Sequence, residues 1–138
     1  MIEALHRLLP ASASIITGIN SLTADNVMAA LDKQGVHVAV NRLGDGDWEL
    51  ESSELTDEQI LALLHIDEAG HIGELSICTE ACSRYGLETF KCDAKELGRF
   101  VSDYNIEMFF DGDVMILAEE SRTLTVYHHA GGFIHVKL

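Results

Sequence analysis

Apolar residues recur at helical spacing in several parts of the chain. At the N-terminus such a run is interrupted by Pro10, which ends a helix because proline lacks a backbone N–H. Further helices are predicted after Thr23, Thr56 and Asp93, since each of these side chains can accept a hydrogen bond from the N–H groups at a helix start. Gln59 completes a capping box with Thr56. A short helical turn is also expected over residues 79–85.

The C-terminal third consists of short β-rich runs separated by turn sequences. The runs are IEMFF, DVMILA, TLTVYHH and FIHVKL, and the separators include Asp-Gly and Gly-Gly. This order predicts an antiparallel β-meander with tight turns, packed against several helices. Val114 to Ala118 is apolar at every position and is therefore expected in the centre of the sheet. Other strands are predicted from Val36 to Val40 and from Ile72 to Cys78, with an extended segment from Leu87 to Lys91.

Length and composition favour a single globular domain of the α+β class, spanning residues 1–138. Hydrophobic residues make up 47% of the chain and charged residues 23%, which is the balance of a packed protein. No apolar run is long enough to cross a bilayer, and Glu3, His6 and Arg7 interrupt the run that a signal peptide needs. We therefore expect a cytoplasmic protein.

The charge of the chain narrows the choice of partners. Its net charge is −14, from 23 acidic and 9 basic residues. Such a field repels phosphate backbones and anionic membranes, so neither nucleic acid nor membrane is expected as a partner. A basic protein would be attracted and captured faster. The alternative is that the charge serves solubility alone.

Cysteine usage points away from a disulfide or zinc framework. The three cysteines are an odd number, and no second closely spaced pair accompanies Cys78 and Cys82. A structural zinc ion needs three or four such ligands. We expect buried free thiols and no cofactor.

The segment from Gly44 to Glu58 is rich in acidic residues and contains no basic residue. Four of its acids alternate along the chain: Asp45, Asp47, Glu49 and Glu51. In an extended segment these carboxylates share one face, and Trp48 and Leu50 share the other. A row of carboxylates beside an aromatic anchor is typical of a contact surface for a basic partner. The other interpretation is a solvated edge strand with its apolar side in the core.

Three histidines lie close together in the last predicted hairpin. If residues 131 and 132 form a two-residue turn, His128 pairs with His135 across the strands, and His129 pairs with Ile134. His128 and His135 then share the outer face, and His129 lies on the core side. Two imidazoles do not complete a metal site, so no metal is expected here.

The outer face of this hairpin forms a second candidate contact patch. The patch consists of His128, His135, Glu119 and Glu120. The same titratable groups support a rival hypothesis, in which His128 and His135 act with Asp111 or Asp113 in a small metal-dependent or acid–base enzyme. No nucleophile or phosphate-loop motif supports that rival.

The run FFDGDVMIL, followed by LTVYHHAGGFIHV, resembles a pattern in small bacterial immunity proteins of contact-dependent inhibition and other polymorphic toxin systems. The resemblance extends from Phe109 to Val136, and Ala130 stands where a glutamate is common in such proteins. It implies an acidic α+β protein that binds a cognate toxin, often a basic nuclease, and blocks its active site or its assembly.

Charge and resemblance together predict a non-enzymatic toxin inhibitor. It would attract its partner electrostatically and bury a few anchoring side chains, with no catalytic residue of its own. The remaining alternatives are the small enzyme described above and a homodimeric ligand-binding or scaffold domain.

Overall fold

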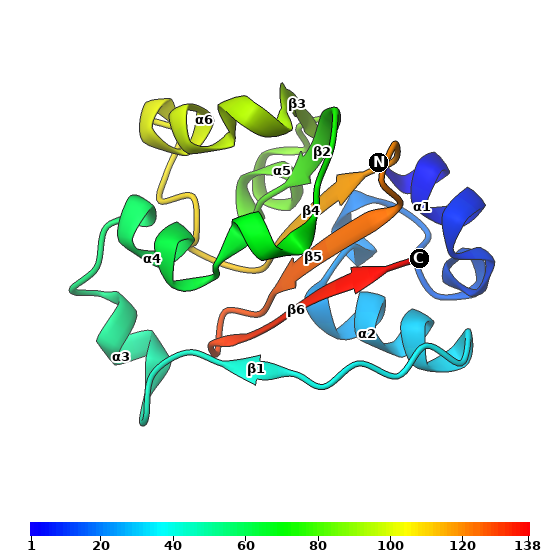
Figure 1. Ribbon diagram of the computed structural model, residues 1–138, viewed down its shortest axis with the longest axis horizontal. Coiled ribbons are helices and arrows are strands. Elements are labelled where there is room, and N and C mark those ends of the chain that lie inside the picture. Colours follow the sequence, from blue (N-terminus) through cyan, green and yellow to red (C-terminus); the bar gives the residue numbers. More distant parts are fainter.

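A six-stranded antiparallel sheet, in the order β1-β6-β5-β4-β2-β3, forms the centre of the computed structural model, which describes residues 1–138 (Figure 1). The strands are β1 (Asn41–Arg42), β2 (Glu74–Cys78), β3 (Phe90–Asp93), β4 (Val114–Ala118), β5 (Thr123–Tyr127) and β6 (Gly132–Lys137). All five strand pairs are antiparallel. The C-terminal meander β4–β5–β6 is therefore the middle of a larger sheet.

Helices cover both faces of this sheet. They are α1 (Ile2–Leu8), α2 (Ala24–Lys33), α3 (Trp48–Ser52), α4 (Asp57–Leu63), α5 (Glu80–Tyr85) and α6 (Leu97–Asp103), with 3-10 turns at Pro10–Ser14, Ile19–Ser21, Ile66–Ala69 and Ala94–Glu96. In Figure 1, α3, α4 and α6 lie to the left of the sheet, and α1 and α2 lie to its right. No helix has the length and apolarity required to span a membrane.

Strand β4 shows why two helical layers are needed. Met115 and Leu117 pack into a core with α1 and α2, whereas Val114, Ile116 and Ala118 pack into a second core with α4 and α6. Every residue of the strand is buried. The predicted central strand and the α+β class are thereby confirmed.

The helix starts marked by capping residues are also confirmed. The Thr23 hydroxyl accepts from the N–H of Asn26 at 3.1 Å and starts α2. At α4, Thr56 and Gln59 form both hydrogen bonds of the capping box. Asp93 caps a 3-10 turn through the N–H of Lys95 at 2.9 Å, and α6 follows that turn.

The run IEMFF, predicted as the first strand of the meander, is not a strand. The backbone N–H groups of Phe109 and Phe110 donate instead to the carboxylate of Asp57, at 2.8 and 3.2 Å. Asp57 is buried at the first turn of α4, where a carboxylate also meets the positive end of the helix. This contact uses the amides that a ladder would need, and β2 takes the place beside β4.

Two other strand predictions need correction. The segment from Val36 to Val40 makes no ladder, and only the next two residues, β1, pair with β6. Val40 is 53% exposed, so alternation alone did not place its side chain in the core. The predicted extended segment from Leu87 forms a strand only in its last part, and β3 continues to Asp93.

The predicted register of the last hairpin is wrong. Tyr127 pairs with Phe133 and Thr125 with His135, so the hairpin loop comprises residues 128–131. The His128 N–H donates to the Gly132 carbonyl at 2.8 Å and closes this loop. Gly131 has a φ of +101°, and a Cβ there would lie 2.8 Å from the Trp48 ring. The loop is therefore shaped by contact with a distant tryptophan.

The cysteines are free, as expected. Cys78 and Cys82 are buried in the core on the α1–α2 side. Cys92 is only half-buried, which the prediction of buried thiols did not anticipate.

Candidate functional site

The acidic segment is a turn followed by a helix, not an extended strand. The Asp47 carboxylate accepts from the Leu50 N–H at 3.4 Å and caps α3. Side chains two residues apart point to roughly opposite sides of a helix, since each residue rotates about 100°. Trp48 is accordingly 3% exposed and Leu50 is 70% exposed. The predicted shared face of Trp48 and Leu50 is wrong.

Trp48 cannot be the aromatic anchor of a contact surface. Its indole N–H donates to the Tyr127 hydroxyl at 2.7 Å inside the core on the α4 side. Burial raises the pKa of Tyr127, although this hydrogen bond opposes the rise. The pair ties α3 to the end of β5. Trp48 therefore holds the acidic segment in place without being accessible to a partner.

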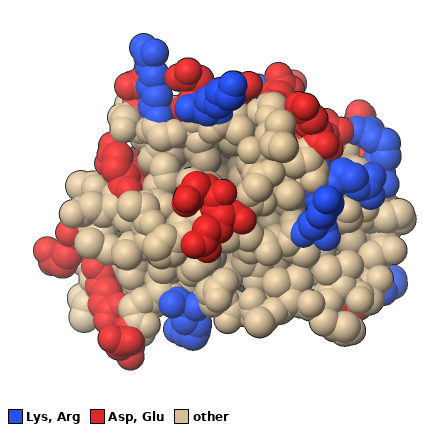
Figure 2. Space-filling view, viewed as in Figure 1, with Lys and Arg blue, Asp and Glu red and all other residues tan.

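The carboxylates around α3 form what we call the acidic surface. It comprises the exposed residues Asp45, Asp47, Glu49, Glu51, Glu54 and Glu58. None of them forms an ion pair with a lysine or arginine, and the chain has no basic residue between Arg42 and Arg84. Figure 2 shows these acidic side chains gathered at the lower left, over α3, with one basic side chain to their right. Elsewhere some of the acidic residues form ion pairs with basic side chains. Arg84, for example, contacts both Glu107 and Asp111.

A hollow lies beside the acidic surface. It has a volume of about 510 Å³ and lies between α3, α4 and the residue 108–111 turn. Glu49, Asp111 and His129 contribute polar groups, and Ile60 and Phe110 contribute apolar walls. No lysine or arginine lines it.

The second predicted patch does not form one surface. Glu119 and Glu120 lie in the turn between β4 and β5, whereas His128 follows the other end of β5. The five residues of β5 separate these ends by roughly 13 Å. Glu119 also pairs with Arg7. The hairpin register and the strand length thus keep these groups apart.

His135 belongs to an interior hydrogen-bond chain. Its Nε2 lies 2.7 Å from the Leu64 carbonyl, which can only accept, so Nε2 carries the proton. In the neutral ring, Nδ1 must then accept from the Thr125 hydroxyl at 2.8 Å. Thr125 in turn accepts from Nε2–H of His71 at 2.8 Å, and His71 Nδ1 accepts from Thr123 at 2.7 Å. Both nitrogens of His135 are used internally, so it is not available as a contact residue.

The direction of this chain depends on both rings being neutral. A second proton on His71 would have to sit on Nδ1, where it would point at the Thr123 hydroxyl that already donates to this nitrogen. Burial, followed by repulsion from His135, lowers the pKa of His71 to about 4. The His71 ring is therefore uncharged at neutral pH.

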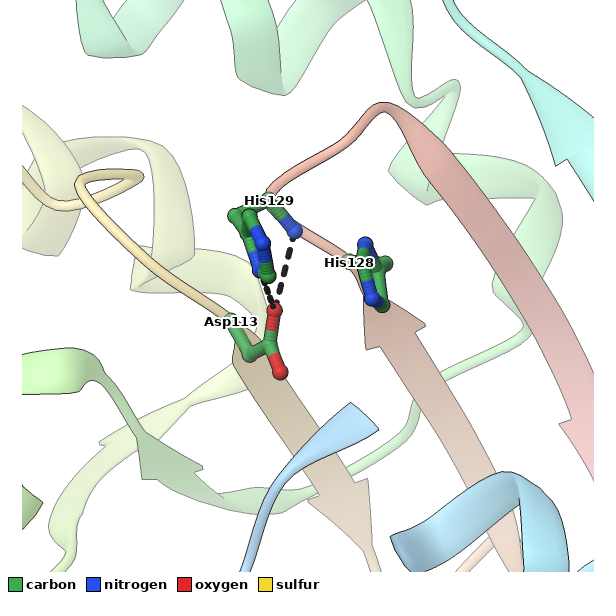
Figure 3. A group of neighbouring side chains, drawn as sticks. All are labelled: Asp113, His128 and His129. Carbon is green, nitrogen blue, oxygen red and sulfur yellow. Dashed lines mark hydrogen bonds and ion pairs between the residues drawn. The ribbon is translucent and has the colours of Figure 1, made fainter. Parts of the chain in front are cut away.

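A different group of titratable residues meets at the hairpin loop (Figure 3). Asp113 Oδ1 accepts from the backbone N–H of His129 at 2.9 Å and from its ring Nδ1 at 2.8 Å. The His128 ring stacks on the His129 ring with centroids 4.3 Å apart. The rival hypothesis had combined Asp113 with His128 and His135. The structure brings Asp113 to His128 and His129 instead.

Sequence reasoning missed His129, which it placed on the core side. Its side chain is 48% exposed because residue 129 lies in the loop rather than in the strand. The pairing of Val114 with Tyr127 explains the contact: the residue before β4 meets the residues after β5. Correct alignment of those two strands would have revealed it.

The electrostatics of this group follow from its hydrogen bonds. Burial alone would raise the pKa of Asp113, but hydrogen bonds from the Ala24 N–H and from His129 bring it below its ordinary value. The same hydrogen bond from His129 to Asp113 raises the pKa of His129. The pair therefore favours a charged carboxylate beside a readily protonated imidazole.

Comparison of this chain with protein-family models, with curated proteins and with solved structures finds no match.

Proposed function

We propose that this protein is an immunity-type inhibitor that binds a basic protein toxin in the cytoplasm through the acidic surface. The observation that carries the proposal is the lack of any lysine or arginine partner for the carboxylates of that surface. Unneutralised charge on one side of a protein accelerates capture of an oppositely charged partner and selects its orientation. The protein acts by occlusion and supplies no catalytic residue.

Leu50 takes the role that the sequence suggested for Trp48. It is the apolar side chain that α3 presents to solvent among the carboxylates. Interfaces combine a desolvated apolar centre with a polar rim. Met108, 51% exposed at the edge of the neighbouring hollow, extends this apolar area.

The resemblance of the C-terminal third to immunity proteins supplies the class of partner. Immunity genes are expected beside the gene of their toxin, so the proposal requires a large upstream reading frame that ends in a basic domain. That domain, produced separately, should bind this protein and should lose its toxicity on co-expression. The absence of such a reading frame would remove the basis for the partner class.

Charge reversal tests the surface. Replacing Asp45, Glu49 and Glu51 by lysine leaves the Asp47 cap intact, and it should weaken binding to the basic domain roughly tenfold or more at low salt. The matched control replaces the exposed residues Asp32, Glu88 and Asp103 by lysine, with the same change in net charge. Calorimetric titration at low and high salt measures both. Equal weakening in the two variants contradicts a specific surface, because net charge alone then explains the affinity.

A further inference from the structure

The loop between β5 and β6 and the start of β4 place metal-binding groups close together. One ligand atom each from Asp113, His128 and His129 lies within 4.8 Å of the other two. The group is positioned by backbone as well as by side chains, since the N–H groups of Ala24 and His129 both donate to the Asp113 carboxylate at 2.9 Å. The carboxylate is therefore held in place before any ligand arrives.

The chemistry of this group suits a borderline metal ion. Two imidazoles and a carboxylate, with no thiolate in the group, are ligands of divalent first-row transition metals. Calcium and magnesium prefer oxygen ligands alone. The net charge of the chain, −14, further favours a cation.

We propose that Asp113, His128 and His129 bind one divalent transition-metal ion, such as zinc. The ion takes the place of the proton between His129 Nδ1 and Asp113 Oδ1, which are 2.8 Å apart. Ligand atoms of a tetrahedral zinc ion lie about 3.3 Å from one another. Small rotations of the His128 and His129 rings bring the ligand atoms, which lie between 2.8 and 4.8 Å apart, to that spacing.

Two further carboxylates complete the surroundings. Asp25 Oδ1 lies 3.4 Å from His128 Nε2, and its exposed side chain can turn to supply a fourth ligand. Glu49 Oε1 lies 3.9 Å from His129 Nε2. When Nδ1 binds the ion, Nε2 carries the ring proton and donates it in a hydrogen bond to Glu49. Such outer contacts orient metal-binding histidines and raise their basicity.

Metal binding requires one rearrangement of His128. In the metal-free protein its Nδ1 accepts from the Ala130 N–H at 3.0 Å, so Nε2 holds the proton and faces Asp25. Coordination through Nε2 moves that proton to Nδ1 and releases the Ala130 N–H. Residue 130 lies in the hairpin loop, where water can replace the lost contact.

Titration of the untagged, chelator-treated protein with zinc chloride tests the proposal. Calorimetry should show saturable binding of one ion per chain. Cobalt(II) should give the visible absorption of a site with nitrogen ligands. Single substitutions His128→Ala and His129→Ala should each weaken zinc binding at least tenfold. The control His37→Ala removes an exposed histidine that also has an acidic neighbour, Asp32 at 3.8 Å, and should leave binding unchanged.

Several outcomes would overturn the proposal. They are binding without a defined stoichiometry, wild-type affinity in both loop variants, and equal loss in the His37 control. Since His129 also holds Asp113, the variant Asp25→Asn provides a test on an exposed ligand, with a smaller but measurable loss expected. Zinc should also raise the unfolding temperature of the wild type, because the ion joins α2, β4 and the hairpin loop.

Of the acidic surface, only Glu49 also contacts the metal-binding group, so variants that avoid Glu49 test the two proposals separately. Loss of zinc binding in the His128 variant should leave capture of a basic protein by the acidic surface unchanged. Conversely, the single substitution Asp45→Lys should leave zinc binding unchanged, since Asp45 is not in the metal-binding group.

Discussion

Two groups of histidines lie beside strand β5, and they differ in what their ring nitrogens contact. His71 and His135 pack on the face that is covered by α4, and all four of their ring nitrogens have hydrogen-bond partners. His128 and His129 lie at the open end of the strand, where their Nε2 atoms have only exposed carboxylates nearby. The ring nitrogens of the first group are all committed to hydrogen bonds within the protein, whereas the second group can exchange a proton for another ligand.

The difference shows why histidine content alone did not identify a site. His135 was selected from the sequence as a contact residue because it was assigned to an outer face. Its partners are the Leu64 carbonyl and the Thr125 hydroxyl, and Thr125 links it to His71. Leu64 and His71 come from segments far away in the sequence. Whether a histidine is structural or reactive depends on such partners, which local spacing does not reveal.

The largest effect is expected when the Thr125 hydroxyl, which links His71 and His135, is removed. Thr125→Val leaves a donor on His71 and an acceptor on His135 without partners. We expect a loss of about 2–4 kcal/mol in the free energy of unfolding, measured by urea denaturation. Thr17→Val, which removes an exposed hydroxyl bonded only to Ser21, should change stability little. Similar losses in both variants would mean that the interior chain has no special role.

The interior group should also produce a pH dependence of stability. The folded-state pKa of His71, about 4, lies below its ordinary value of 6.5, so the unfolded chain binds the proton first as pH falls. The contribution of His71 to the free energy of unfolding should be fully present above pH 6.5, decline as the pH falls to 4, and level off below pH 4. We expect about 2 kcal/mol from this residue, since the ring is partly exposed.

Comparison with His71→Gln separates this contribution from that of the carboxylates. Urea denaturation across the pH range should show a shallower decline between pH 6.5 and 4 in the variant. Parallel curves for the variant and the wild type would show that His71 is not the titrating group.

The pair of His129 and Asp113 at the open end of β5 should give a smaller pH dependence of stability, with the opposite sign. Asp113 raises the folded-state pKa of His129, so its contribution is present below pH 6.5 and is lost as pH rises through the raised value. The ring is half-exposed, which limits the contribution to less than about 1 kcal/mol. His129→Ala should therefore lower stability slightly at pH 6 and hardly at all at pH 8, in the presence of a chelator. A larger effect at pH 8 would contradict this interpretation.

Elements defined by local contacts were predicted well. The starts of α2 and α4 follow from Thr23 and Thr56, whose side chains bond to N–H groups three residues on. Strand β4 follows from five apolar residues between polar turns. In each case the residues that determine the element are neighbours in the sequence.

Elements that depend on distant residues were predicted poorly. The amides of Phe109 and Phe110 bond to Asp57, so an apolar run that reads as a strand forms a turn. The wider hairpin loop at Gly131 accommodates Trp48. Alternation of acids around Trp48 suggested a strand, but Asp47 starts a helix that places Trp48 against Tyr127.

The sequence by itself determined the α+β class, the capped helices, the doubly buried strand and an acidic segment without basic residues. These properties depend on composition and on contacts within a few residues. Only the tertiary structure decided which histidines meet Asp113, which are enclosed, and that Leu50 rather than Trp48 faces solvent. Those outcomes depend on strand register and on the direction of side chains, and a shift of one residue in register reverses the face to which a side chain points.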